Sequence, residues 1–283
     1  MIRFHDVVPI QPDGAVLPAE RVRAFLDTYP LPTEVGRGWA SLDPDYAKDL
    51  LALLYAASAE TRVLTRLFVG DIIGAIPGRG LAVDIGSGPG RLVEIFRGFE
   101  RVTLVERDER SLPLLRERVA QLALPASILE TDYDELDLSG EPCDLKTFTH
   151  SIYYFECDWN ELARTAFSTI RPGGSLVFTL NGDEGGAARM VDDLAAMGYR
   201  GLSKLDIASF IAACTRIPDA RVSVHRLPLR IHDQQEPAFM VHMARIFLED
   251  LRVPIATEDV LDYLRTQADR LNFVDKVIEL KRE

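Results

Sequence analysis

The chain has 283 residues, of which 47% are hydrophobic and 27% charged, and its formal net charge is -12. This composition is sufficient for a sizeable core, excludes a disordered chain and predicts no membrane segment. No run of Lys and Arg could form the basic stripe of a nucleic-acid-binding protein, so we expect a small neutral or cationic partner and no nucleic acid.

The three cysteines, Cys143, Cys157 and Cys214, have no paired spacing. Scattered cysteines favour reduced thiols over a disulfide framework or a zinc site. The opening stretch MIRFHDVVPI carries Asp6 among its apolar residues, which is not typical of a signal peptide. We therefore expect a cytoplasmic protein. A monomer and a homodimer both remain open.

Residues 1–44 are rich in Pro and Gly and predict one short helix, in PAERVRAFLDTY. This extension could be a flap over a ligand or a strap on the outside of the core.

Residues 45–76 predict a helix with one apolar face. Apolar positions recur at steps of three and four along Tyr46, Leu50, Leu53, Ala57, Glu60 and Leu64. Glu60 is the only carboxylate in this set. Either Ser58 caps a new helix and Glu60 lies in its first turn, or Glu60 points into a pocket.

From residue 81 the pattern alternates between strands and helices. We expect strands in LAVDIGS, RVTLVE, ASILET, CDLKTFTH and SLVFTL, and helices in GRLVEIFRGF, ERSLPLLRERVAQLA and NELARTAFSTI, with a turn at RPGG. Such alternation predicts an α/β fold with a doubly wound, mostly parallel sheet. Further helices are expected near 203–215, 236–249 and 257–270, and further strands near 221–231 and in FVDKVIEL.

Three glycines, Gly86, Gly88 and Gly90, follow the first of these strands, where bare backbone can approach a ligand. The dinucleotide fingerprint G-x-G-x-x-G is not met, because Arg91 stands where its third glycine belongs. The second strand ends in Glu106, where an acid can bind both hydroxyls of a ribose. Glu106 could instead only cap a strand end at the surface.

The glycine loop, Glu106, the segment ETDYDEL and the turn RPGG, in this order, resemble the class I S-adenosylmethionine-dependent methyltransferases. The resemblance implies S-adenosylmethionine as cofactor and a Rossmann-like sheet of seven strands. It implies an N-terminal extension and helical cover at 1–78, a cofactor-binding core at 79–181, and a substrate lobe with the remaining strands at 182–283. The cofactor contacts that it implies are Asp84, Gly86, Ser87, Gly88, Glu106, Arg107, Ser111, Thr131, Asp132, Tyr133 and Thr149.

The fourth strand is followed by THSIYYF, which contains neither the Asn/Asp-Pro-Pro-Tyr run of nucleobase-methylating enzymes nor carboxylates for magnesium. The sequence therefore predicts no metal, and catalysis by positioning of the acceptor.

The segments DYAKDLLALLYAASAETRVL, LVERD and DLKTFTHSIYYF are similar to the histamine N-methyltransferase group. The resemblance implies that Glu60 binds the polar end of the substrate and that Tyr46 forms an aromatic wall. Tyr153 and Tyr154 match a Tyr-Tyr pair of that family, and His150 replaces a glutamine that contacts substrate. The family's lid tryptophans are replaced by other residues in GDEGGAARM, and its C-terminal asparagine is matched to Asn272.

We therefore expect methyl transfer to a small aromatic or heteroaromatic nitrogen compound, in a setting such as natural-product biosynthesis. Methylation of an amine and of a ring carbon such as indole C3 both remain open, with Glu60 and His150 as catalytic residues. His150 could be a base or only a hydrogen-bonded structural residue. Alternative functions are a non-catalytic sensor that binds S-adenosylmethionine and an O-methyltransferase of a small phenol.

Overall fold

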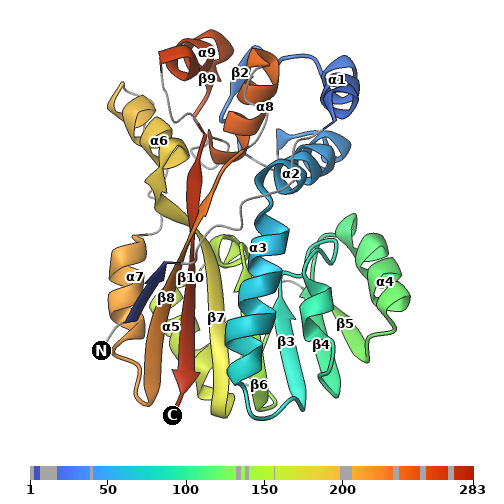
Figure 1. The fold of residues 1–283 in the computed structure, drawn as a ribbon, viewed down its shortest axis with the longest axis vertical. Helices are drawn as coiled ribbons and strands as arrows, with labels where there is room; N and C mark the ends of the chain where they lie inside the picture. Colours follow the sequence, from blue (N-terminus) through green and yellow to red (C-terminus); the bar gives the residue numbers. More distant parts are fainter. Residues whose placement is uncertain are drawn as a thin grey trace.

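A central sheet of eight described strands organises the molecule (Figure 1), in the order β1-β8-β10-β7-β6-β3-β4-β5. The computed structural model describes residues 3–6, 18–38, 41–131, 135–137, 140–155, 157–197, 206–231, 236–248, 253–266 and 271–283. The strands of the sheet are β1 (Arg3–Asp6), β3 (Leu81–Ile85), β4 (Arg101–Glu106), β5 (Ala126–Glu130), β6 (Cys143–Thr149), β7 (Ile170–Gly185), β8 (Ala220–Leu229) and β10 (Phe273–Arg282).

The sheet is mostly parallel, as the sequence predicts. Among the described pairings, β10 runs antiparallel to β7 and β8, and the others are parallel. Seven of these strands form the predicted Rossmann-like sheet. The eighth, β1, comes from the N-terminal extension and pairs in parallel with the edge strand β8.

Helices cover both faces of the sheet (Figure 1). On one face lie α5 (Trp159–Ser168) and α7 (Ile207–Cys214), where Phe178 of β7 stacks on Phe148 and meets the edge of Phe210. The other face is covered by α3 (Glu60–Leu67) and its continuation, and by α4 (Ser111–Leu122) near β5. Each buried phenylalanine contributes roughly 1.5–3 kcal/mol through removal of apolar surface from water.

A lobe stands above the carboxyl ends of the parallel strands (Figure 1). It contains α1 (Ala19–Thr28), α2 (Pro44–Ser58), α6 (Gly186–Ala196), α8 (Pro237–Leu248), α9 (Thr257–Thr266) and the small β2 (Glu34–Val35)–β9 (Ile255–Ala256) pair. The predicted helix near 203–215 is α7, and it packs on the sheet rather than in this lobe. Within the described residues, no helix combines the length and apolar character needed to cross a membrane.

Two local predictions are wrong, and a third is correct in part. The helical stretch predicted over 45–76 breaks at Ala59, which has a φ of 58°, so a new helix begins at Glu60 as one alternative expects, although its N-cap is Ala59 and not Ser58. After α3 the chain continues as a π-helix (Phe68–Ile72) and a 3-10 turn (Ile73–Ala75). The helix predicted in GRLVEIFRGF is only a 3-10 helix, Val93–Phe96, between two glycines of positive φ. The RPGG turn lies within β7, where the register with β6 shifts.

Candidate active site

The glycine loop crosses the carboxyl end of β3 and is fastened to β4. The backbone N–H groups of Gly86 and Ser87 both donate to the Val105 carbonyl, at 2.9 and 3.0 Å. Gly86 and Gly88 have φ values of 78° and 55°, which favour glycine. A Cβ on Gly88 would meet nothing within 4 Å, so this glycine borders open space in which a ligand can approach the backbone.

Glu106 ends β4 directly beside this loop. Its carboxylate accepts hydrogen bonds from the backbone N–H groups of Gly88, Arg107 and Asp108, at 2.6, 2.9 and 2.8 Å. The residue is 3% exposed, which contradicts the alternative of a strand-end cap at the surface. A buried carboxylate beside the open space at Gly88 provides the charged acceptor that ribose hydroxyls require, so the geometry fits the predicted cofactor.

Asp84 lies on β3 beneath the loop. Its Oδ1 accepts a hydrogen bond from the Thr147 hydroxyl at 2.6 Å, and its backbone carbonyl accepts one from the Ser87 hydroxyl at 3.3 Å. Burial raises the pKa of the Asp84 carboxyl to about 6, and the nearby Glu106 adds to the shift, although the hydroxyl hydrogen bonds oppose it. Asp84 therefore ties β3 to β6 and holds the base of the loop.

The other predicted cofactor residues are distributed along the same edge. Ser111 begins α4 and donates to Asp108 at 2.9 Å, while the Arg107 side chain is exposed. Thr149 ends β6 opposite Thr179 of β7. Thr131 directly follows β5, and the predicted contacts Asp132 and Tyr133 lie outside the described residues.

Glu60 and His150 come together, although 90 residues separate them in the sequence. His150 follows β6 with a φ of 53°, and its backbone N–H donates to the Thr179 carbonyl at 3.0 Å. Its Nε2 lies 3.4 Å from Glu60 Oε1 and 3.5 Å from Asp275 Oδ2. A histidine at the carboxyl end of the sheet thus faces two carboxylates.

Arg91 completes this group from the end of the glycine loop. Its Nη1 donates to Glu60 Oε1 at 2.5 Å, and its guanidinium carbon lies 3.7 Å from the centre of the Tyr55 ring. Thr61 accepts a longer hydrogen bond from the same nitrogen, at 3.4 Å. Arg91 therefore links the glycine loop to the junction between α2 and α3.

Burial makes the charges of this group strongly interdependent. Burial opposes ionisation of Glu60, but Arg91 and His150 hold the pKa of its carboxyl well below the usual range. Burial also disfavours the charged imidazole, yet Asp275 and Glu60 raise the pKa of His150 to about 9. Burial raises the pKa of the Asp275 carboxyl, and the charge of Glu60 raises it further, while His150 pulls it down. The arrangement can hold or transfer a proton.

One atom from each of Glu60, His150 and Asp275 lies within 4.8 Å of the other two, in a combination that a metal ion could bind. The sequence predicts no metal because it shows no such combination along the chain. Strand pairing brings Asp275 to the other two residues. Metal-independent chemistry therefore stays a prediction.

The predicted aromatic residues occupy different places. Tyr46 lies in the lobe, where its hydroxyl is 2.8 Å from His242 Nδ1, and its ring contacts Phe25 and Tyr29. Tyr153 follows His150 closely, and its hydroxyl accepts a hydrogen bond from the backbone N–H of Asn181 at 2.6 Å. The side chain of Tyr154 lies outside the described residues.

Sequence reasoning missed Arg91, Tyr55 and Asp275. Arg91 is treated there only as the residue that fails the dinucleotide pattern, although its place beside the loop was a usable signal. Asp275 is the one acid at the start of the apolar stretch FVDKVIEL, and Asn272, the suggested counterpart of a family asparagine, precedes it. The Asn272 carbonyl accepts a hydrogen bond from Ala187, at the start of α6.

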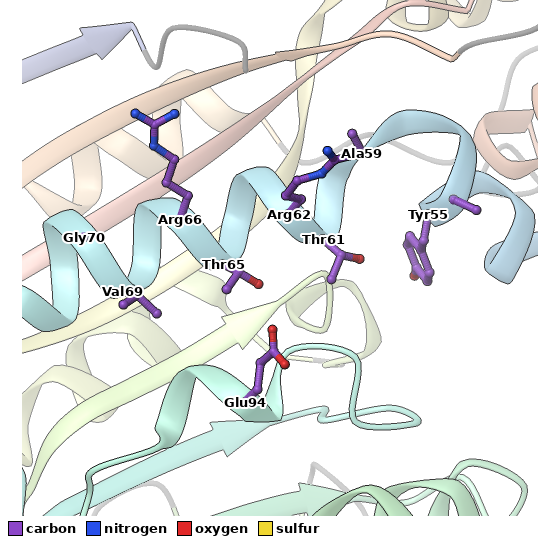
Figure 2. A pocket seen from close by; sticks show the side chains of 10 residues that line it. Tyr55, Ala59, Thr61, Arg62, Thr65, Arg66, Val69, Gly70 and Glu94 are labelled. Carbon is purple, nitrogen blue, oxygen red and sulfur yellow. The ribbon is translucent and has the colours of Figure 1, made fainter. Parts of the chain in front are cut away.

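A groove of about 780 Å³ runs along the outer side of α3 (Figure 2). Its walls include Thr61, Thr65, Arg62 and Arg66 of α3, with Glu94 of the 3-10 helix opposite. The groove lies outside the charged group described above, although Tyr55 and Thr61 at one end both contact Arg91.

The comparisons with known proteins agree with this geometry. A family model described as a methyltransferase domain matches residues 82–174. The YcgJ protein from Bacillus subtilis is 13% identical, with a TM-score of 0.51 over 76% of this chain and 98% of that chain. The plantazolicin methyltransferase BpumL, solved with a triazolic desmethylPZN analog and SAH, is 13% identical, with a TM-score of 0.53 over 93% and 99% of the two chains.

A possible histamine N-methyltransferase from Thermotoga maritima also matches, at 16% identity and a TM-score of 0.45 over 79% of this chain and 91% of that chain. No curated protein matches the sequence. The matched domain contains the glycine loop and Glu106, and the shared fold extends over nearly the whole chain. Residues 82–174 therefore carry a methyltransferase domain, and the glycine loop and Glu106 within it fit S-adenosylmethionine as the cofactor.

Proposed function

We propose that this enzyme methylates the nitrogen of a small aromatic or heteroaromatic amine without a metal, and that His150 takes the proton that the nitrogen must lose. The observation that supports the proposal is the imidazole of His150, which faces two buried carboxylates at the carboxyl end of β6. Small molecules are the expected partners, and nucleic acid is not. We expect a cytoplasmic monomer or homodimer.

The cofactor would be held by the edge of the sheet that carries the glycine loop. Gly88 leaves room for it, and Glu106 would bind its ribose, with further contacts from the other predicted residues on that edge. When bound, S-adenosylmethionine supplies a methyl group that its sulfonium already activates. The residues of the chain therefore need only orient the acceptor and manage its proton.

The two nitrogens of the His150 ring have different surroundings. Because Nε2 faces both carboxylates, it retains its proton, and the other ring nitrogen is left as the basic atom. The side chain of His150 is 18% exposed, against 3% for Glu60 and 0% for Asp275, so a ligand can reach the imidazole first. A base with a pKa near 9 also matches the pKa of an alkyl amine group carried by an aromatic ring, which makes proton transfer from such an acceptor nearly balanced.

The reaction balances in charge and protons. An acceptor with an ammonium group would donate a proton to the neutral imidazole, and the freed lone pair would form the bond to the methyl carbon as the bond from that carbon to sulfur breaks. The products are the methylated ammonium, S-adenosylhomocysteine and one proton that His150 returns to water. This sequence requires the loss of one proton before methyl transfer, so the rate should rise with pH toward about 9.

Glu60 is better suited to hold charge than to act as a base. Its carboxylate is ion-paired to Arg91 and has a lowered pKa, so it remains ionised. We propose that Glu60 orients His150 and Arg91. The polar end of the acceptor would lie next to these charged side chains. Tyr153 and Tyr154 are proposed to line the acceptor pocket, and Tyr46 to support its outer aromatic wall in the lobe.

Methyl-labelled cofactor and a panel of heteroaromatic amines, indoles and phenols, followed by mass spectrometry, test the proposal. The structure of BpumL in complex with a triazolic compound makes heteroaromatic acceptors a sensible start. Label on an amine nitrogen is the expected result. If the label appears only on indole carbon or phenol oxygen, the acceptor is an indole or a phenol and not an amine. Binding of the cofactor without any transfer would indicate a sensor.

A further inference from the structure

Asp275 is a buried acid whose ionised form has to be stabilised by a neighbour. It lies on β10 opposite Asn181 of β7 and Leu227 of β8, in the interior of the sheet. The residue is 0% exposed, and neither carboxylate oxygen has a hydrogen-bond partner among the described residues. The nearest charged partner is His150 Nε2, at 3.5 Å. Burying a carboxylate without a compensating partner is costly.

The neighbouring cations are engaged elsewhere, apart from His150. Arg91 is ion-paired to Glu60, and Lys276, the next residue on β10, pairs with Asp183 and lies 3.3 Å from Glu184. With His150 protonated, the two carboxylates, the guanidinium and the imidazolium sum to no net charge. A divalent metal with a neutral imidazole would leave one buried net positive charge, so the imidazolium is the better counterion.

We propose that Asp275 is the positioning residue of His150: it holds Nε2 from the sheet side, so that the ring presents its other nitrogen to the acceptor. The proposal rests on the proposed function of His150. Asp275 has no exposed surface through which to touch the acceptor, so it acts through the imidazole. The backbone of His150 is fixed as well, by its bond to Thr179, and both ends of the residue are therefore held.

The proposal implies that the protonation of His150 depends on Asp275. The other groups that face the imidazole are Glu60 from α3 and, behind Glu60, Arg91 from the glycine loop and Tyr55 from α2. An opposite charge within about 4–6 Å shifts a pKa by roughly 1–3 units. Removing the charge of Asp275 should therefore lower the pKa of His150 by at least about one unit.

The test is nuclear magnetic resonance of the full-length chain with isotope-labelled histidine, in the wild type and in Asp275→Asn, with His150→Ala used to assign the signal. Glu279→Gln is the matched control, because Glu279 is a buried acid on the same strand whose neighbour is His225. We expect the titration midpoint of His150 to fall in Asp275→Asn, to recover in part in Asp275→Glu, and to stay unchanged in Glu279→Gln.

An unchanged midpoint in a folded Asp275→Asn protein would overturn the proposal. So would stoichiometric binding of Mn²⁺ or Zn²⁺ that Asp275→Asn abolishes, because the cluster would then be a metal site. If Asp275→Asn does not fold, the wild-type titration decides, and a His150 midpoint below about 6.5 contradicts the proposal. This readout needs no acceptor, so a failure to find a methylated amine would count against the proposed function alone.

Discussion

Arg91 and Glu60 form a buried ion pair that joins the end of the glycine loop to the first residue of α3. The side chains are 15% and 3% exposed, and the guanidinium lies against the face of Tyr55. The pair therefore connects the part of the chain that is proposed to bind the cofactor to the part that is proposed to face the acceptor.

Breaking this pair from one side should be costly. Arg91→Ala leaves Glu60 as a buried carboxylate without its main counterion, and we expect it to lower the free energy of unfolding by about 3–5 kcal/mol. Urea denaturation measures the effect. The double variant Arg91→Ala with Glu60→Gln should be less destabilised than Arg91→Ala alone, and Arg62→Ala, an exposed arginine of α3, should change stability by less than about 0.5 kcal/mol. Equal losses in the single and double variants would contradict a coupled pair.

Glu106→Ala should weaken binding of S-adenosylhomocysteine. The ribose hydroxyls would lose a charged acceptor, which costs about 1–3 kcal/mol, or roughly 5- to 150-fold in affinity. Calorimetry measures the change, with Glu109→Ala, an exposed acid three residues away, as the control. Tight binding of NAD to the wild type, or unaltered affinity in Glu106→Ala, would refute the assignment of Glu106 to the ribose.

His150 occupies a left-handed backbone conformation, so two small substitutions should differ in stability. Alanine at a φ of 53° retains the strain that a Cβ causes, whereas glycine adopts this conformation freely. His150→Gly should therefore be more stable than His150→Ala by about 1 kcal/mol in chemical denaturation. Both variants should lose turnover and keep their affinity for S-adenosylhomocysteine, since His150 is proposed to face the acceptor and not the cofactor. A more stable alanine variant would show that the strain is absent.

Asp84 should make a pH-dependent contribution to stability. Its pKa in the folded protein is about 6, against an ordinary value of 3.8, so the folded state binds more protons between these values. The contribution of Asp84 is therefore most favourable at low pH and falls as pH rises from about 4 to 6, by up to roughly 3 kcal/mol. Asp84→Asn removes this titration. The stability of the variant relative to the wild type should thus increase between pH 4 and pH 7 in urea denaturation, and a constant difference would contradict the raised pKa.

Methyl transfer should survive removal of divalent metals. Dialysis against a chelator, followed by a turnover assay with the acceptor that the labelled panel identifies, is the measurement. We expect unchanged activity, because Arg91 already balances the charge of Glu60. A loss of activity that Mg²⁺ or Mn²⁺ restores would assign the triad of Glu60, His150 and Asp275 to a metal.

The sequence predicts the sheet well because strand and helix periods differ clearly. The strand predicted in RVTLVE has the same bounds as β4, and the glycine loop follows β3 as expected. The resemblance also brings together Glu60 and His150, which the structure places 3.4 Å apart. A new helix at Ser58 is one of the alternatives that the sequence offers, but neither glycine nor asparagine marks Ala59 as the left-handed residue. Asp275 could not be assigned because its position depends on which strand β10 joins and in which register.

The length of β7 limits how the lobe can move. β7 spans 16 residues, pairs with β10 as far as Gly185, and leads without a loop into α6 of the lobe. The two strands also approach closely, since a Cβ on Gly182 would lie 2.0 Å from the Val274 carbonyl oxygen. We therefore expect the β7–β10 pair to be a rigid connection between the sheet and the lobe. The N-terminal connection, by contrast, passes from α2 to α3 through the single residue Ala59, and Arg91 contacts both sides of it, at Tyr55 and Glu60.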